Sequence, residues 1–503
     1  MHSFKRYFLA LDQPKTGPIY FALLSALMIL MLFPIGLTGN EENYFQLAYR
    51  TISPEKFTEY HAAFDQSKAR FATEYLFGSL VYLFGYEIAH AVARICMALF
   101  YAAGLTYFFR SLRLSVLDAL LAIVLFDLAG EHLMGGEWLF YGVESKTLAY
   151  AFLLFAFGSV NHDRWRLAII AGAAATYMHF LVGGFWTLVI LLLHWYRERD
   201  IRSSGKAFFF YSVLILPLLY LIAKDQLIAH ALPTTGLSAD KIYAEIRNPH
   251  HIAPFSGSSA FWTFWVWLPG LITTASLAVV MSVMVSKEKH NLIALAALIG
   301  LVELMLAMLI SYLDRNTLIF AKLYLFRPSS LTLFFVIVAL LATFKEQLSE
   351  EGQQLKALLT GAITVPFCWW HIATQIGYYH NHVFPERQAL VAAINQYTKS
   401  GEIVLIEPYK EFEQEYLSLH RDIDRPTLVS WKFVPTNPPD ILRWYALTQL
   451  RKRIFEQGCP QQSDIPIRWL IALHPKALEK LVNCGPVVWH EGNVALIEMN
   501  NSR

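Results

Sequence analysis

Two adjacent carboxylates, Glu41 and Glu42, follow directly on the first long apolar segment of the chain. Such a pair resists burial, and its charges repel each other unless something occupies the space between them. Carboxylates in this position serve as a general base, as metal ligands or only as solvated loop charges. Because Asn43 and Tyr44 flank the pair where a cavity between helices could reach it, we expect half of an active site here. Glu42 is favoured over Glu41 as the base.

A second acidic cluster, Glu137 and Glu144, lies in the glycine-containing stretch 131–146. It is expected at the same membrane boundary as the first pair, and a shared cavity is one interpretation. In the other, Lys146 only neutralises its neighbour at the interface. If Glu42 and Glu144 held one divalent ion, their oxygen ligands would suit magnesium or manganese, although no ligand spacing requires a metal.

Basic and imidazole side chains in the other outer loops could bind an anionic, lipid-borne group. Arg315, Lys322 and Arg327 lie on an expected outer loop, whereas positive charge usually gathers in the cytoplasmic loops. Nonspecific contact with lipid headgroups would also explain these three cations. His179 is more often a packing histidine than a site residue, and paired histidines on a loop are only a weak metal signal. The candidates for substrate binding are Arg247, His250, His251, Arg315, Lys322, Arg327 and His179.

The composition places these residues in a multi-pass membrane protein. Of 503 residues, 55% are hydrophobic, the mean hydropathy is +0.39, and the net charge of +2 lacks the basic excess of a nucleic-acid-binding protein. About eleven apolar runs qualify as spans by length and composition. They cover approximately residues 18–37, 88–109, 114–130, 147–160, 167–180, 181–195, 207–229, 259–285, 291–312, 329–344 and 357–376.

The charge distribution orients the chain in the membrane. Short basic connections, such as those at Arg110 and at Lys287, alternate with longer connections rich in carboxylates, histidines and aromatics. By the positive-inside rule the amino end is cytoplasmic, and an odd number of spans places the end of the chain outside. We therefore expect a multi-pass protein of a bacterial inner membrane with a periplasmic carboxyl-terminal domain.

Two parts of the chain are expected to differ in character. Residues 1–379 would form the membrane module, with interfacial helices in a first outer loop at 38–87, or alternatively a loop that merely packs there. Residues 380–503 predict a small α/β domain, and Cys459 and Cys484 within it could form a disulfide if it faces an oxidising compartment. The stripe expected on the interfacial helix is Phe57, Tyr60, Phe64 and Phe71. The apolar stretch that follows at 75–84 is too short to span and predicts a juxtamembrane or re-entrant segment. The tail is expected to contain a helix at 388–397 and strands at 403–406, 427–429, 469–472, 487–489 and 494–497.

The order of these features resembles the GT-C superfamily of integral membrane glycosyltransferases. The resemblance rests on an acidic motif after the first span, a long first outer loop, a second acidic motif before the fourth span and a soluble tail. The segment from Arg247 to His251, and Arg425-Pro426 followed by Trp431-Lys432, are similar to segments of an uncharacterised bacterial branch of that class. This chain has Glu41-Glu42 where the family pattern has an Asp-containing motif.

The resemblance implies transfer of a sugar from a polyprenyl-phosphate donor to a glycan, lipid or protein acceptor at the outer membrane face. Glu42 would be the base, supported by Glu144 or Glu137, and the cations would hold the departing phosphate. A single displacement would invert the sugar carbon, and Glu42→Gln would abolish transfer. The alternatives are a transporter or flippase of lipid-linked glycans and a noncatalytic envelope scaffold. No nucleotide-binding or HExxH motif occurs in a supporting context.

Overall fold

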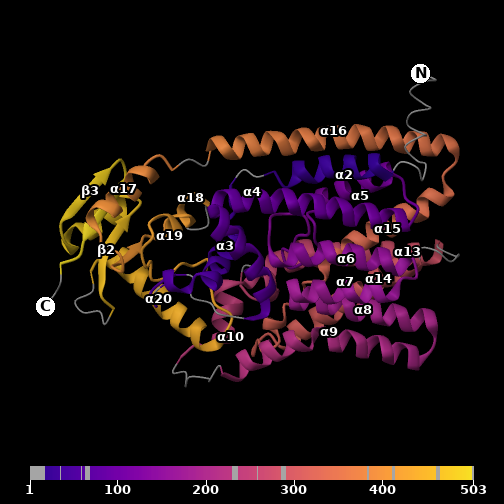
Figure 1. Ribbon diagram of the computed structural model, residues 1–503, viewed down its shortest axis with the longest axis horizontal. Coiled ribbons are helices and arrows are strands. Elements are labelled where there is room, and N and C mark those ends of the chain that lie inside the picture. Colours follow the sequence, from indigo (N-terminus) through magenta and orange to yellow (C-terminus); the bar gives the residue numbers. More distant parts are fainter. Residues whose placement is uncertain are drawn as a thin grey trace.

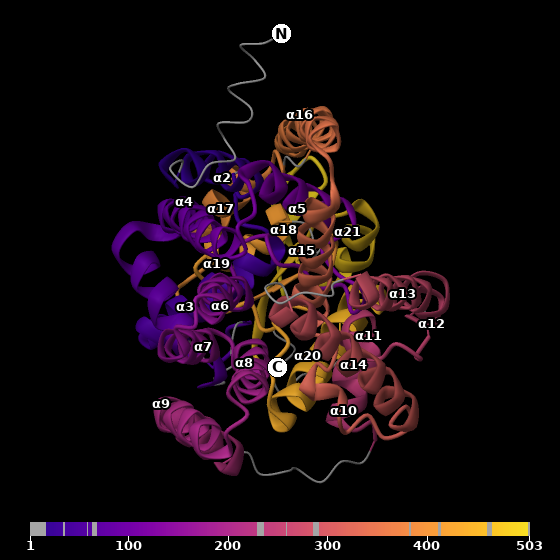
Figure 2. The ribbon, with the colours of Figure 1, turned by 90° about the vertical axis from the view of Figure 1, so that its right-hand side faces the viewer.

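The computed structural model is mostly helical, with one small sheet near the carboxyl end (Figure 1). Its long helices run alongside one another, and the sheet lies beyond one end of this bundle. Figure 2, which views the helices end-on, shows α16 and α9 at opposite edges of the bundle. The structure describes residues 17–33, 36–57, 59–62, 68–228, 236–257, 259–284, 291–381, 384–410, 414–459 and 465–500.

Every apolar run expected from the sequence coincides with one or more helices. Among the described residues, six helices are long and apolar enough to cross a membrane, and two shorter apolar helices, α2 and α15, accompany them. The chain is therefore a multi-pass helical membrane protein, while the count of eleven spans stays a prediction. The bundle consists of α2 (Gly17–Met31), α4 (Phe71–Ser111), α5 (Val116–Leu128), α6 (Ser145–Asn161), α7 (Trp165–Met178), α8 (Phe180–Glu198), α9 (Ile201–Ile228), α12 (Ser259–Trp262), η5 (Thr263–Trp267), α13 (Leu268–Met284), α14 (Asn291–Leu313), α15 (Ser329–Gln347) and α16 (Glu350–Asn381).

The first outer loop is organised differently from the expectation. Its main helix comes earlier, as α3 (Gly39–Ile52), because Thr38 forms a capping box with Glu41 there. Phe57 and Tyr60 lie outside the helices, and Phe64 lies outside the described residues. The remaining short elements on this side are η2 (Pro54–Lys56), η3 (Lys68–Arg70), α10 (Ala239–Lys241), the π-helical η4 (Ile242–Arg247), α11 (Pro249–Ile252) and η6 (Ala321–Leu323).

The short apolar stretch at 75–84 is not a separate re-entrant segment. It belongs to α4, which begins at Phe71 and continues through the expected second span to Ser111. Gly85 interrupts the helix with φ of 74°, a value that glycine adopts without the steric cost of a side chain. The interruption divides α4 into an outer part and a longer inner part.

The carboxyl-terminal region, which we call the cap (residues 384–500), contains one four-stranded sheet of order β1-β2-β4-β3. Strands β1 and β2 are parallel, and the two pairs that involve β4 are antiparallel. A disulfide joins Cys459 to Cys484. The cap elements are α17 (Arg387–Tyr397), β1 (Ile403–Ile406), α18 (Gln414–Leu417), α19 (Leu419–Asp422), α20 (Pro438–Gln457), β2 (Ile467–Ala472), α21 (Pro475–Leu481), η7 (Val482–Cys484), β3 (Val487–Glu491) and β4 (Val494–Glu498).

The strand expected at 427–429 is wrong. Leu428 has φ of 61°, outside the extended region, and its N–H donates to the carbonyl of Tyr60, 2.7 Å away, instead of to a sheet. The segment thus joins the cap to the first outer loop. Its apolar residues suggested a strand because they are buried, which periodicity alone cannot distinguish.

The cap shares a buried hydrophobic cluster with η4. Ile242 and Tyr243 of η4 belong to the same buried cluster as Leu405 of β1 and Trp444 of α20. Apolar burial is the main favourable term in such a contact, so the cap and the outer loops should form one cooperative unit. Residues on both sides of the boundary predicted near residue 380 therefore share one buried cluster.

An ion pair also fastens the cap to the first outer helix. Arg421 of α19 places its Nε 3.1 Å from both carboxylate oxygens of Glu42, and its Nη2 is 2.7 Å from Glu87 of α4. Glu42 is completely buried, whereas the side chain of Glu87 is 63% exposed. Arg421 also pairs with Asp422, 2.9 Å from its Nη1, so its ionic partners range from the completely buried Glu42 to the solvent-screened Glu87.

We predict that Glu42→Gln loosens the cap. Removing the completely buried charge of Glu42 leaves Arg421 with only Asp422 and Glu87 as ionic partners, which should cost about 2 kcal/mol of folding free energy. Thermal unfolding in detergent and the rate of proteolysis between bundle and cap would measure this. Glu87→Gln is the matched control and should cost less than about 0.5 kcal/mol, because its charge is solvated. Equal effects of both substitutions would contradict the assignment.

Candidate functional site

A cavity of about 700 Å³ lies where one end of the helical bundle meets the cap. Its lining comes from α3, the stretch before α6, the α7–α8 junction, η4 and α11, η6 and the cap segment 432–438. Apolar side chains from α8 and α9 line part of it. The polar and aromatic lining residues include Asn40, Asn43, Tyr44, Arg70, Trp138, Glu144, Lys146, His179, Tyr243, Arg247, Asn248, His250, His251, Lys322, Tyr324, Arg327, Lys432 and Thr436.

Helix α3 contributes two asparagines and a tyrosine to this cavity, and neither of its two glutamates. Residues three and four apart share one face of a helix, and Asn40, Asn43 and Tyr44 form such a set. Glu41 and Glu42 fall on other faces and are not among the lining residues. The segment 40–44 thus contributes to the cavity as expected, but through Asn40, Asn43 and Tyr44 instead of Glu41 and Glu42.

Glu41 is completely buried and connects three segments of the chain through its hydrogen bonds. Its carboxylate accepts hydrogen bonds from Nε and Nη2 of Arg94 at 2.9 and 2.8 Å, and His90 Nε2 lies 3.1 Å away. It also accepts the backbone N–H of Thr38 and that of Val143, both at 2.8 Å. Burial alone would raise the pKa of Glu41, but Arg94 and His90 hold it well below its usual range. A charged Glu41 thereby fixes α3, α4 and the residue before Glu144 to one another.

Glu42 faces the cap instead of the cavity. Besides Arg421, its carboxylate accepts a hydrogen bond from Nε2 of Gln46, 3.1 Å away. Burial raises the pKa of Glu42, and Arg421 opposes the rise. These contacts leave Glu42 in a position suited to docking the cap.

Glu144 is the carboxylate that lines the cavity. It occupies the N-cap position of α6, and Asn40 Nδ2 donates to its Oε1 at 2.8 Å. Its Oε2 lies 3.9 Å from Nζ of Lys146. Burial raises the pKa of Glu144, while Lys146 and the Asn40 hydrogen bond oppose the rise. A carboxylate with a raised pKa is a stronger base, and Glu144 could therefore accept a proton in the cavity.

Glu137 holds the cations in place without lining the cavity. Its Oε2 lies 2.9 Å from Lys146 Nζ and 2.8 Å from Arg327 Nη1, and its Oε1 is 3.9 Å from His251 Nδ1. Burial would raise its pKa, but Arg327 and Lys146 lower it to about 2. Glu137 therefore stays ionised and partly neutralises the two cations.

The backbone of this stretch is shaped to bring these groups together. Glu131 accepts the N–H groups of Leu139 and Phe140 at 2.6 and 2.8 Å, which closes the turn. Gly135 has φ of 77°, and a Cβ there would lie 2.9 Å from the Cβ of Phe326. Only glycine satisfies both conditions, so this turn can pack directly against the residue before Arg327.

The structure brings together most of the predicted binding residues. Arg247, His250, His251, Lys322, Arg327 and His179 all line the cavity. His179 Nδ1 accepts the N–H of Val182 at the start of α8, which fixes its ring. Arg327 lines the cavity, although its Nε–H is buried and has no hydrogen-bond partner among the described residues.

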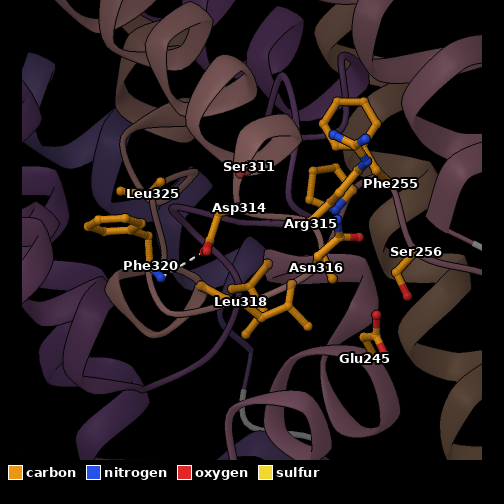
Figure 3. Close-up of a pocket in the computed structure, with 14 residues that line it drawn as sticks. Glu245, Phe255, Ser256, Ser311, Asp314, Arg315, Asn316, Leu318, Phe320 and Leu325 are labelled. Carbon is orange, nitrogen blue, oxygen red and sulfur yellow. Dashed lines mark hydrogen bonds between the residues drawn. The ribbon is translucent and has the colours of Figure 1, made fainter.

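Arg315 lies elsewhere, in a smaller cavity of about 170 Å³ shown in Figure 3. It contacts the ring of Tyr312, 4.3 Å from the centroid, and its Nη1 donates to the Tyr312 carbonyl. Asp314 beside it accepts the N–H of Phe320 at 2.8 Å. The structure therefore separates Arg315 from the other predicted binding residues.

Two cations of the site were not identified from the sequence. Arg70 precedes α4 and contacts the ring of Tyr44, 5.4 Å from the centroid. Lys432 comes from the cap, more than 280 positions after Glu144 along the chain. For Lys432, the only indication in the sequence was the resemblance of the Trp431-Lys432 pair to segments of related proteins. Nothing in a linear pattern indicates that a residue of the tail enters a cavity of the bundle.

The arrangement of the carboxylates does not fit a magnesium or manganese ion shared by Glu42 and Glu144, which the sequence left open. Among the described residues, no group of three or more His, Cys, Asp and Glu side chains could hold a metal ion. Glu42 bonds to Arg421 and Glu144 to Asn40, so the two carboxylates proposed to share an ion face different partners. Mg²⁺ and Mn²⁺ favour several converging oxygen ligands, which this pair does not supply.

These features define a helical membrane protein with a capped, cation-rich outer cavity. The chain is similar to ArnT from Cupriavidus metallidurans in the apo state, with a TM-score of 0.40, 12% identity and coverage of 97% of this chain and 98% of that one. At this TM-score no site residue is transferred, and the assignments here rest on the geometry. No protein-family model and no curated protein matches the chain.

We predict a pH-dependent contribution of Glu137 to stability. Because its pKa is lowered from 4.5 to about 2, the contribution is complete above about pH 4.5 and is lost as the pH falls towards 2. Glu137→Gln should therefore be less stable than the wild type at pH 7, and the two should converge in acid. Thermal unfolding between pH 3 and 7 measures the difference. A difference that does not change with pH would contradict this account.

Proposed function

We propose that the protein is a membrane glycosyltransferase that moves a sugar from a polyprenyl-phosphate donor to an acceptor at the outer face of a bacterial inner membrane. The observation that carries the proposal is the cavity itself. Among its lining residues are six lysine and arginine side chains and one carboxylate, Glu144. A base facing an anion-binding wall is what transfer from a lipid phosphate requires.

Glu144 is assigned as the base in place of Glu42. It would take the proton from the acceptor hydroxyl as that oxygen attacks the sugar carbon, and the bond from this carbon to the phosphate oxygen would break. One displacement of this kind inverts the configuration at the sugar carbon. Asn40 orients Glu144 through Oε1, which leaves Oε2 for the proton.

The leaving phosphate is assigned to the cations held by Glu137. Arg327 and Lys146 both line the cavity, and Lys146 lies beside Glu144. A phosphate becomes more negative when the sugar departs, so these charges stabilise the transition state more than the ground state. A phosphate needs little protonation to leave, and the cations suffice for this step.

The arrangement also supports a lipid-borne donor. Phe180 and Leu181 of α8 and Ile222 of α9 line the cavity on the side of the bundle. A polyprenyl chain could lie against such apolar residues while its phosphate reaches the cations. The disulfide between Cys459 and Cys484 supports a periplasmic cap, because disulfides persist in oxidising compartments. The acceptor would enter from the cap side.

We predict that Glu144→Gln lowers transfer by a factor on the order of 100 to 10,000, the contribution usual for a general base. Transfer would be measured as incorporation of a labelled polyprenyl-linked sugar into membranes. Glutamine still accepts the hydrogen bond from Asn40, so polyprenyl-phosphate binding and thermal stability should be retained. Glu87→Gln is the control and should remain active. Full activity of Glu144→Gln would overturn the assignment.

A second comparison separates Glu144 from Glu42. If Glu42 acts only by docking the cap, Glu42→Gln and Arg421→Met should lower transfer to a similar extent, because each breaks the same ion pair. The pair of variants would be assayed with the same labelled donor. Loss of transfer in Glu42→Gln with full transfer in Arg421→Met would restore Glu42 as the base.

A further inference from the structure

The cap supplies a cation that the leaving phosphate does not require. Lys432 lines the cavity, and its Nζ makes no hydrogen bond or ion pair with a described residue. Lys146 and Arg327, by contrast, are both held by Glu137. An ammonium that lines a cavity and has no partner among the described residues is available to an anionic ligand.

Lys432 lies among other donors that come from outside the Glu137 cluster. Arg247 of η4 donates from Nε to the carbonyl of Trp431, 2.9 Å away, which fixes the guanidinium beside the start of the Lys432 segment. His250 of α11 also lines the cavity, and its ring centroid lies 4.0 Å from that of His251, with the two rings tilted by 46°. An ammonium, a guanidinium and an imidazole in one wall form a set of donors for an oxyanion.

The volume allows two anions at once. About 700 Å³ is within the range of pockets that enclose a drug-sized ligand, more than one phosphate occupies. The Glu137 cluster comes from the bundle side, and the Lys432 group comes from η4, α11 and the cap. The cavity therefore offers one position for an anion at the Glu137 cluster and another at the Lys432 group. Two such positions suit two substrates that each carry an anionic group.

We propose that Lys432, Arg247 and His250 form a second oxyanion subsite, which binds a phosphate or carboxylate group carried by the acceptor. The assignment to the acceptor rests on the proposed function, since the donor phosphate occupies Arg327 and Lys146. The cap then selects an anionic acceptor and positions its hydroxyl towards Glu144. A neutral acceptor would leave Lys432 unpaired in the closed cavity.

The experiment measures binding to the full-length protein in nanodiscs saturated with undecaprenyl phosphate. The probes are glucose 6-phosphate, glucuronate and neutral glucose, so that the two anionic groups are distinguished. At least one anionic probe should bind about tenfold or more tightly than glucose. Lys432→Met should remove this preference, Lys432→Arg should keep it, and neither should change the affinity for undecaprenyl phosphate by more than about threefold.

The pH dependence gives a readout that a purely structural role would not produce. Burial and then Arg247 lower the pKa of Lys432 to about 8, and Lys146 acts in the same direction while Glu144 opposes it. Burial and Arg247 also lower the pKa of His250, so this ring is neutral at that pH. Binding of the anionic probe should weaken as the pH rises through about 8 in the wild type but not in Lys432→Arg.

The outcomes separate this subsite from the proposed function. If glucose binds as well as the anionic probes, or if these probes displace undecaprenyl phosphate, the second subsite is overturned and the proposed transfer stands. If undecaprenyl phosphate does not bind while an anionic probe binds in a Lys432-dependent way, the subsite stands and the proposed donor fails. Unchanged anion preference in Lys432→Met also overturns the subsite.

Discussion

The buried contact between Glu41 and Arg94 is the constraint on which the site depends. A carboxylate removed from water is costly unless charges and hydrogen bonds replace its hydration. Here a guanidinium, an imidazole and two backbone N–H groups do so. One of these N–H groups belongs to Val143, and Glu144 is the next residue. Glu41, one of the two carboxylates expected in the active site, therefore holds in place Glu144, which we assign to the chemistry.

Glu137 likewise positions the cations that we assign to the phosphate. Glu137 neutralises part of the charge on Lys146 and Arg327 and keeps them close together while the cavity is empty. Like charges would otherwise repel and disperse. A ligand phosphate can then add to a preorganised arrangement instead of assembling it, which reduces the free-energy cost of binding.

The cap is part of the site as well as part of the fold. Its β1 and α20 share a buried cluster with η4, Arg421 pairs with Glu42, and Lys432 reaches the cavity. Loosening the cap should therefore disturb binding even though no cap residue is assigned to the reaction itself. This coupling explains why Glu42 could affect activity from a position outside the cavity.

The sequence by itself determined the elements and the neighbourhood of the site. Long apolar runs must be helices in a membrane, because only helices satisfy every backbone group within one segment, and each run is a helix here. Four of the five expected tail strands occur, and so do six of the seven expected binding residues in one cavity. Only the tertiary structure decided which carboxylate faces that cavity. Adjacent helical residues differ by about 100° in direction, and the partners that capture Glu41 and Glu42, Arg94 and Arg421, come from distant parts of the chain.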